Sequence, residues 1–198
     1  MRESYQKKTD ELLKTLGGEK KRLLLQCCCG PCSTYVLEYL SEYFDLTVLF
    51  YNPNIQPREE YEKRRRALGQ VLERYPHIGL LFCDYDGESF DKAASGLEAE
   101  PEGGARCTEC FKLRLGETAR LAKAGGFDYF CSTLSVSPHK DAQRLNEIGL
   151  SLERELGVRW LPSDFKKKEG YKRSIELSRE YGLYRQEYCG CLYSLPNK

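Results

Sequence analysis

The chain lacks any long apolar run. No window approaches the roughly 18 consecutive apolar residues that a transmembrane helix requires, and residues 1–8 lack the apolar core of a signal peptide. We therefore expect a folded protein of the cytoplasm with no membrane partner. Histidine is also scarce, because His77 and His139 are the only two. We expect both in surface or hydrogen-bonded loop positions, so histidine is not the expected metal ligand.

Two nucleotide-binding fingerprints are also missing. Neither G-x-G-x-x-G nor G-x-x-x-x-G-K-[ST] occurs, which removes the usual phosphate-binding loops. Net charge gives no guide to nucleic acid, since 31 basic residues oppose 30 acidic ones and leave +1. Any basic surface must therefore be local.

Apolar segments of strand length alternate with helical patterns along the chain. Strands are predicted at residues 23–25, 46–51, 78–83, 128–134 and 158–161, and helices at residues 2–16, after Cys32, and at 58–75, 107–124, 141–156 and 170–181. This alternation predicts one doubly wound α/β domain over residues 1–198, Rossmann-like or HUP-like, with a mostly parallel five-stranded sheet and helices on both faces. Residues 84–104 form an acidic excursion, with a short helix near 89–95. Residues 165–198 form a basic segment, a helix and a Cys-Gly-Cys tail.

Three loops follow predicted strands and carry polar or thiol groups. They lie at residues 26–33, 52–57 and 135–139. In a parallel sheet the carboxyl ends of the strands share one edge, and ligands bind there. We expect these three loops to meet at that edge.

Cysteine is abundant and clustered. Ten cysteines are present, and seven of them form the clusters Cys28-Cys29-x-x-Cys32, Cys107-x-x-Cys110 and Cys189-x-Cys191. In a reducing compartment, clustered cysteines indicate metal or redox chemistry more often than disulfides. Seven thiolates exceed the four that one tetrahedral zinc uses, which favours an iron–sulfur cluster, a second metal, or working thiols beside a structural site. A structural zinc site with spare thiols is the plainer alternative.

The remaining cysteines are given other roles. Cys83 and Cys131 lie among apolar residues of predicted strands and are expected in the core. The clustered cysteines lie in turns or at helix starts, where thiolates are favoured. We assign no role to Cys27.

Five motifs together resemble one family. They are C-C-x-P-C at residues 28–32, F-Y-N-P-N-I-x-P-x-x-E-Y at 50–61, R-C-x-x-C at 106–110, T-L-x-x-S-P at 133–138 and Y-R-Q-x-Y-C-G-C at 184–191. In this order they resemble the QueH-type epoxyqueuosine reductases over nearly the whole chain. The resemblance implies reduction of epoxyqueuosine to queuosine at the wobble position of tRNA, the last step of that modification, without cobalamin.

The resemblance also implies a cofactor and its ligands. A [4Fe–4S] cluster and a second, adjacent metal, iron, would be bound by Cys28, Cys29, Cys107, Cys110, Cys189 and Cys191, with Cys32 as a further metal ligand. Cys28, Cys29, Cys32, Cys189 and Cys191 are the candidate catalytic thiols. A low-potential electron donor, not identified, is the implied protein or small-molecule partner.

Candidate RNA contacts come from the same motifs and from local basic charge. Five positive charges oppose Glu169 in residues 166–173, and a second basic face lies at residues 58–66, where glutamates accompany it. Aromatic side chains can stack on splayed RNA bases. The predicted tRNA-binding set is Asn52, Tyr61, Arg64, Ser137, His139, Lys166, Lys167, Lys168, Arg185, Gln186 and Tyr188.

Two other functions stay open. One is another iron–sulfur tRNA-modifying enzyme, a tRNA sulfur transferase, although no nucleotide-activating loop is visible. The other is a zinc-stabilised RNA-binding protein, which would need four thiols and not seven.

Overall fold

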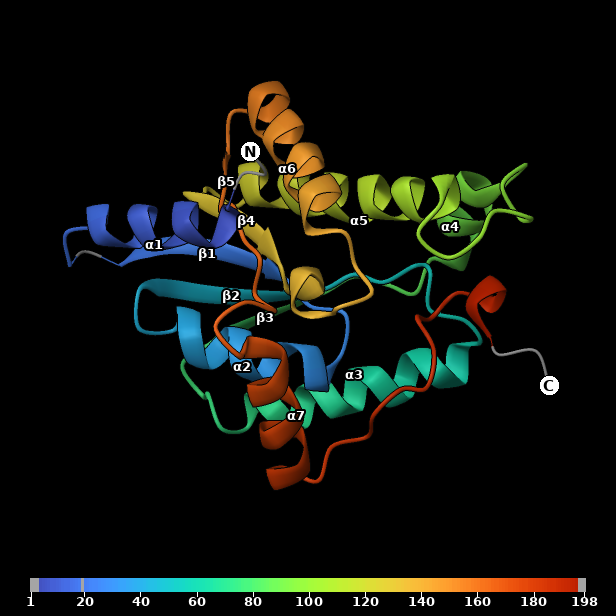
Figure 1. The fold of residues 1–198 in the computed structure, drawn as a ribbon, viewed down its shortest axis with the longest axis horizontal. Helices are drawn as coiled ribbons and strands as arrows, with labels where there is room; N and C mark the ends of the chain where they lie inside the picture. Colours follow the sequence, from blue (N-terminus) through green and yellow to red (C-terminus); the bar gives the residue numbers. More distant parts are fainter. Residues whose placement is uncertain (1–3, 19, 196–198) are drawn as a thin grey trace.

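The computed structural model describes residues 4–18 and 20–195 and contains one five-stranded sheet (Figure 1). The strands are β1 (Lys21–Gln26), β2 (Phe44–Phe50), β3 (Gly79–Phe82), β4 (Tyr129–Ser132) and β5 (Arg159–Trp160), in the order β3-β2-β1-β4-β5. Every pairing is parallel; in the centre, Leu24 of β1 lies between Thr47 and Phe130. The predicted α/β class is confirmed, and the sheet is wholly parallel where a mostly parallel one was predicted.

Helices cover both faces of the sheet. They are α1 (Tyr5–Thr15), α2 (Gly30–Leu40), α3 (Arg58–Leu72), α4 (Gly87–Ala94), α5 (Ala105–Ala124), α6 (Ala142–Leu156) and α7 (Gly170–Glu180). Figure 1 shows α2, α3 and α7 together on one face and α5 and α6 on the other. Because both faces are covered, the central strands are apolar throughout, and Leu23, Leu24 and Leu25 are fully buried. None of the described helices is both long and apolar enough to cross a membrane.

The structure corrects the ends of two predicted strands. The fourth strand stops at Ser132, and Thr133–Val136 forms a 3-10 helix, η1, whose start is capped by the Ser132 hydroxyl. Cys83 lies just after β3 and is half-buried, so it is not inside a buried strand as predicted. The reason is that β3 is an edge strand, and Phe82 is 54% exposed. Cys131 lies in β4 and is fully buried, as expected.

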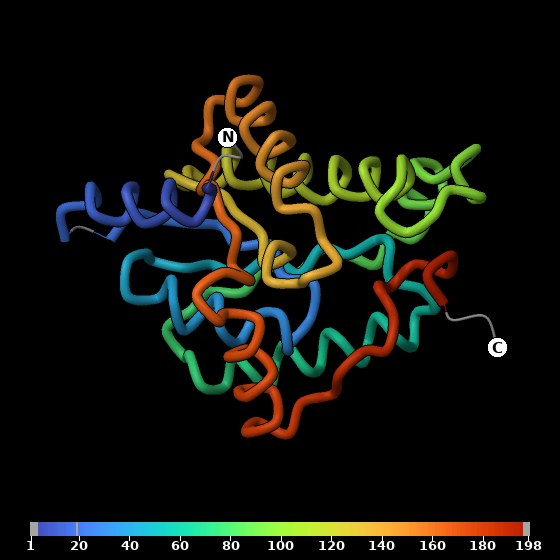
Figure 2. Tube along the Cα trace, viewed as in Figure 1, coloured from blue at the N-terminus to red at the C-terminus, as the bar shows by residue number. Residues whose placement is uncertain are grey.

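Two segments outside the sheet complete the description. The acidic stretch 84–104 contains α4, which begins after the capping side chain of Asp86 and packs on α5. The C-terminal segment leaves α7 and runs beside α3 toward the carboxyl edge of the sheet (Figure 2). Residues 1–3, 19 and 196–198 of the predicted 1–198 domain lie outside the described residues, and the single-domain assignment stays a prediction.

Candidate metal centre

The first cysteine group sits where β1 passes into α2. Cys29 caps α2, its sulfur accepting the Cys32 amide at 3.4 Å. Gly30 lets the helix start press against α3, because a Cβ there would lie 2.5 Å from the carbonyl oxygen of Ala67. The sulfurs of Cys28, Cys29 and Cys32 all lie within 4.8 Å of one another, the one such group among the described residues. They lie at the reversal point of the sheet, because β1 has β2 on one side and β4 on the other.

Burial and the hydrogen bonds among the three thiols control their ionisation. Burial raises the pKa of Cys29 to about 12. Hydrogen bonds from Cys29 and Cys32 hold the pKa of Cys28 well below its usual range, with help from the charge of Arg114. Hydrogen bonds to Cys28 and Cys29 stabilise the neutral thiol of Cys32 and raise its pKa. The expectation that every clustered thiol is a favoured thiolate is therefore wrong, since one ionised thiol disfavours the next.

The second group lies at the start of α5. Cys107, Cys110 and Arg114 share one face of this helix by their spacing of three and four residues. The Cys107 sulfur accepts the Gly103 amide at 3.2 Å. Burial raises the pKa of Cys110 to about 12, and the charges of Cys189 and Cys191 add to that rise. Cys110 and Cys191 belong to one small buried cluster with Phe90 and Ala94.

The C-terminal tail carries the third group to the same place. The buried guanidinium of Arg64 donates to the carbonyl oxygens of Cys189 at 2.9 Å and Tyr188 at 3.0 Å, and to Glu60 at 2.7 Å. Gly190 has φ +137 and lies against Ile55 and Arg64, where a Cβ would meet Ile55 at 3.1 Å. The Gln186 amide donates to the Cys29 sulfur at 3.1 Å. The tail therefore joins α3 to the first cysteine group.

Lys140 contributes a buried cation beside the tail. Its ammonium donates to the Cys189 sulfur at 2.8 Å and pairs with Glu102 at 3.1 Å, while the residue is only 8% exposed. Burial alone would lower its pKa, but Cys189 and Glu102 raise it. Burial raises the pKa of Cys189, and the positive charge of Lys140 opposes that rise.

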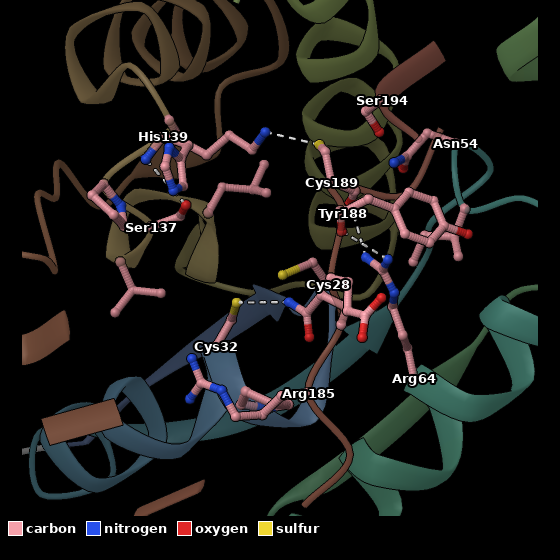
Figure 3. Close-up of a pocket in the computed structure, with 18 of the residues that line it drawn as sticks. Cys28, Cys32, Asn54, Arg64, Ser137, His139, Arg185, Tyr188, Cys189 and Ser194 are labelled. Carbon is pink, nitrogen blue, oxygen red and sulfur yellow. Dashed lines mark hydrogen bonds between the residues drawn. The ribbon is translucent and has the colours of Figure 1, made fainter. Parts of the chain in front are cut away.

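These groups surround one pocket of about 400 Å³ (Figure 3). Its lining includes Cys28, Cys32 and Cys189, and the three loops after β1, β2 and β4 all contribute, as predicted. Cys107, Cys110 and Cys191 are buried and do not line it. The structure thus brings Cys28, Cys29 and Cys32 to metal-binding distance and places Cys189 in the lining of the same pocket.

A buried polar network under the pocket was missed by the sequence reasoning. Asn52 is 1% exposed, donates to the Cys27 carbonyl at 2.8 Å and accepts from Arg114 at 2.7 Å and Gln26 at 2.9 Å. Gln26 also accepts from Ser132 at 2.8 Å. The only signals in the sequence were Gln26, at the end of an apolar strand, and Arg114, which follows Cys107 and Cys110 at helical spacing. This network fixes the loops that carry the first cysteine group.

The predicted RNA-binding residues fall into two sets. Those that line the pocket are Arg64, Ser137, His139, Arg185, Gln186 and Tyr188. The others, Asn52, Tyr61, Lys166, Lys167 and Lys168, do not. Tyr61 is buried between Phe50 at 5.0 Å and Tyr85 at 4.8 Å. Lys166 pairs with Asp164 at 2.6 Å and Lys168 with Asp10 at 2.7 Å.

The residues present fit an iron–sulfur centre. Thiolate sulfur is the ligand that such clusters use, and the sulfurs of Cys28, Cys29 and Cys32 lie within 4.8 Å of one another beside a pocket that Cys189 also lines. Within the described part of the chain, the buried Nε of Arg114 and Oε1 of Gln186 have no hydrogen-bond partner. Buried polar groups are rarely left so in proteins, and both residues line the pocket, as expected for a site shaped around a polar or charged group.

Known proteins with similar sequences agree on the family. Residues 23–197 match the family model described as epoxyqueuosine reductase QueH. A protein of that name from Streptococcus pyogenes is 42% identical over 96% of this chain and 78% of its own, and one from Staphylococcus epidermidis is 44% identical over 89% and 77%. One from Thermotoga maritima is 36% identical over 87% of this chain and 90% of its own.

A solved structure shares the fold. The U34-tRNA thiolase NcsA from Methanococcus maripaludis, solved with its [4Fe–4S] cluster, matches 96% of this chain and 68% of its own at a TM-score of 0.59 and 17% identity. At that identity the likeness shows the fold alone. The match of the family model over nearly the whole chain, with relatives above 40% identity, shows that the chain belongs to the epoxyqueuosine reductase QueH family of oxidoreductases.

Proposed function

We propose that the protein reduces epoxyqueuosine to queuosine at wobble position 34 of tRNA, the last step of queuosine biosynthesis, with a [4Fe–4S] cluster, an adjacent iron and no cobalamin. The observation that carries this proposal is the group of three cysteine sulfurs, those of Cys28, Cys29 and Cys32, within 4.8 Å of one another beside a pocket that Cys189 also lines. Family membership supplies the reaction class.

The reaction has a simple balance. Both carbon–oxygen bonds of the epoxide break, a carbon–carbon double bond forms, and the oxygen leaves as water after taking up two electrons and two protons. A low-potential donor supplies the electrons. The bound metal centre would pass them on one at a time and polarise the departing oxygen.

The chain's own residues hold the centre and the substrate. We propose Cys28, Cys29, Cys107, Cys110, Cys189 and Cys191 as ligands of the cluster and second iron, with Cys32 as a further ligand. Catalytic thiols would be among Cys28, Cys29, Cys32, Cys189 and Cys191. Gln186 orients the Cys29 sulfur and Arg64 holds the tail, so that the pocket excludes water on that side.

At the pocket mouth, exposed polar side chains are the candidates for the substrate nucleoside. His139 and Arg185 are exposed and line the pocket from opposite sides, one after β4 and one on the tail. No ion pair holds Arg185 among the described residues. We propose that Arg185 contacts a phosphate of the anticodon loop, while His139 and Ser137 contact the modified base.

A basic and aromatic groove next to the tail extends this surface. It has a volume of about 800 Å³, and its lining includes Lys63, Arg65, Arg66, Phe82 and Tyr184. Arg65 lies over the Phe82 ring at 5.5 Å and Lys63 over the Tyr184 ring at 5.8 Å. Tyr184 borders this groove while the next residue, Arg185, borders the pocket. We propose that it binds nucleotides of the tRNA that flank the modified one.

Replacing Phe82 with serine tests this groove. Loss of one stacked base is expected to raise the Kd for tRNA by about 5- to 150-fold, since stacking contributes about 1–3 kcal/mol per base. The matched control is Leu81→Ser, because Leu81 is 40% exposed in the same strand but lies outside the groove. Equal tRNA affinity of the two variants in a filter-binding titration would refute the groove as an RNA site.

The lysine segment at residues 166–168 is a separate prediction. Lys166 and Lys168 each pair with a carboxylate, which leaves Lys167 as the one without an ion pair in the described chain. If these lysines bind RNA phosphates, replacing all three with alanine lowers the slope of log K against log salt by about 0.7 to 0.9 per lost contact. An unchanged slope would mean that other residues contact the phosphates. The iron content of the triple variant should equal that of the unaltered protein.

A tRNA sulfur transferase is the second candidate, because the solved thiolase shares the fold. The sequence shows no nucleotide-activating loop, which such an enzyme is expected to need. The test is to incubate the anaerobically purified protein with tRNA that carries epoxyqueuosine and a low-potential reductant, then to analyse the nucleosides by mass spectrometry. Loss of one oxygen mass at position 34 supports the proposal. An unchanged nucleoside, with iron and sulfide present, contradicts it.

A further inference from the structure

Three arginine side chains are almost completely buried, and in the described part of the chain only one of them pairs with a carboxylate. Arg64, Arg106 and Arg114 are 1%, 2% and 2% exposed. Arg64 pairs with Glu60 at 2.7 Å. Arg106 donates to the carbonyl oxygens of Leu97, Glu98 and Glu100. Among the described residues, the guanidinium of Arg114 donates to Asn52 and also lowers the pKa of the Cys110 thiol by a hydrogen bond, while its Nε has no partner.

A buried cation without an anion is costly. Desolvation of a guanidinium is repaid in proteins by a carboxylate or by several acceptors. In the described part of the chain Arg114 forms no ion pair, and Asn52 is a neutral partner. The groups in the neighbouring space that can carry negative charge opposite Arg114 are thiols, Cys28 and Cys110.

The neighbouring space is the pocket between the cysteine groups. Arg114 lines it, and its charge lowers the pKa values of both Cys28 and Cys110, so it lies between the first and second groups. Arg114 is also one helical turn beyond Cys110 on the same face of α5. A cluster held by thiolates carries net negative charge, which this position would balance.

We infer that Arg114 is a positioning residue whose positive charge balances the negative charge of the iron–sulfur centre. Asn52 holds the guanidinium in place. The charge thereby sets the reduction potential of the centre and how firmly the protein retains the iron. This inference rests on the iron–sulfur centre of the proposed function. A fixed positive charge favours the more negative, reduced state. Its removal should therefore lower the reduction potential.

The test compares Arg114→Met with Arg106→Met, a matched loss of a buried guanidinium that donates to backbone carbonyl oxygens and does not line the pocket. Arg114→Met is expected to lower the midpoint potential in a spectroelectrochemical titration and to release iron to a chelator about 10- to 100-fold more readily. Without metal, the Tm of the Arg114→Met variant should equal or exceed that of the unaltered protein, because a buried charge without a carboxylate partner has been removed. Arg106→Met should lower the Tm and leave the potential unchanged.

Two conservative variants keep the test decisive if Arg114→Met does not fold. Arg114→Lys keeps the charge and should keep a potential near that of the unaltered protein, whereas Arg114→Gln should lower it. Equal potentials and iron retention in the Lys and Gln variants would overturn the inference, as would a loss of tRNA affinity alone. If the unaltered protein binds no cluster at all, the proposed function itself fails, which the iron content reports separately.

Discussion

Replacing Cys189 with serine is expected to remove most of the bound iron and to lower the reduction of epoxyqueuosine tRNA by at least about 100-fold, the upper end of what loss of an outer-shell partner causes. Serine has nearly the shape of cysteine but is a poor ligand for iron in a cluster. Cys189 is half-buried beside Lys140 and lines the pocket. The expected result is a folded chain with an empty or damaged centre, measured by iron analysis and turnover. Cys107→Ser should behave alike.

Cys131→Ser is the matched control. Cys131 is fully buried in β4, and its sulfur lies 3.4 Å from the Leu161 carbonyl oxygen and 3.7 Å from the Ser163 hydroxyl. A serine there would find partners, so we expect full iron content and a stability loss near the low end of about 1–3 kcal/mol. Full iron and activity in Cys189→Ser or Cys107→Ser would mean that the three cysteine groups do not serve one centre.

Replacing Arg64 with methionine is expected to have the second large effect. Arg64 holds the carbonyl oxygens of Tyr188 and Cys189 and pairs with the buried Glu60. Removing one partner of a buried pair leaves an uncompensated charge and costs about 3–5 kcal/mol of unfolding free energy. The tail would also lose its anchor on α3, so iron should be lost as well. Denaturant unfolding and iron analysis measure the two effects.

Two controls separate charge from anchoring. Arg120→Met removes an arginine whose side chain is 60% exposed and paired with Glu117, and we expect a change below about 1 kcal/mol. The double variant Glu60→Gln with Arg64→Met removes both charges and should recover part of the stability without recovering iron. Recovery of iron in the double variant would contradict the assignment of Arg64 as the anchor of the tail.

Much of the fold was accessible from the sequence because its signals are local. Alternating apolar runs and helical patterns predicted all five strands, and the loops after β1, β2 and β4 meet as expected. The end of β4 was missed because the Ser132 hydroxyl turns the chain into η1, which no periodicity reveals. Cys83 was misplaced because an apolar run does not tell an edge strand from a central one.

The site was only partly accessible for the opposite reason, since its contacts join distant segments. The seven clustered cysteines were visible as short motifs. The contact of Arg64 with the tail spans 125 positions, and that of Arg114 with Asn52 spans 62. The ion pair of Lys168 was equally hidden, because its partner Asp10 lies 158 positions away. Charge runs read from sequence ignore such partners.

The most direct test of the central claim is the iron and acid-labile sulfide content of the protein after anaerobic purification and reconstitution. The seven clustered cysteines of the sequence suit a four-iron cluster and one further iron, so we predict about four or five irons and about four sulfides per chain. The absorption of the centre should bleach in air. Two or fewer irons per chain, or zinc without sulfide, would contradict the account.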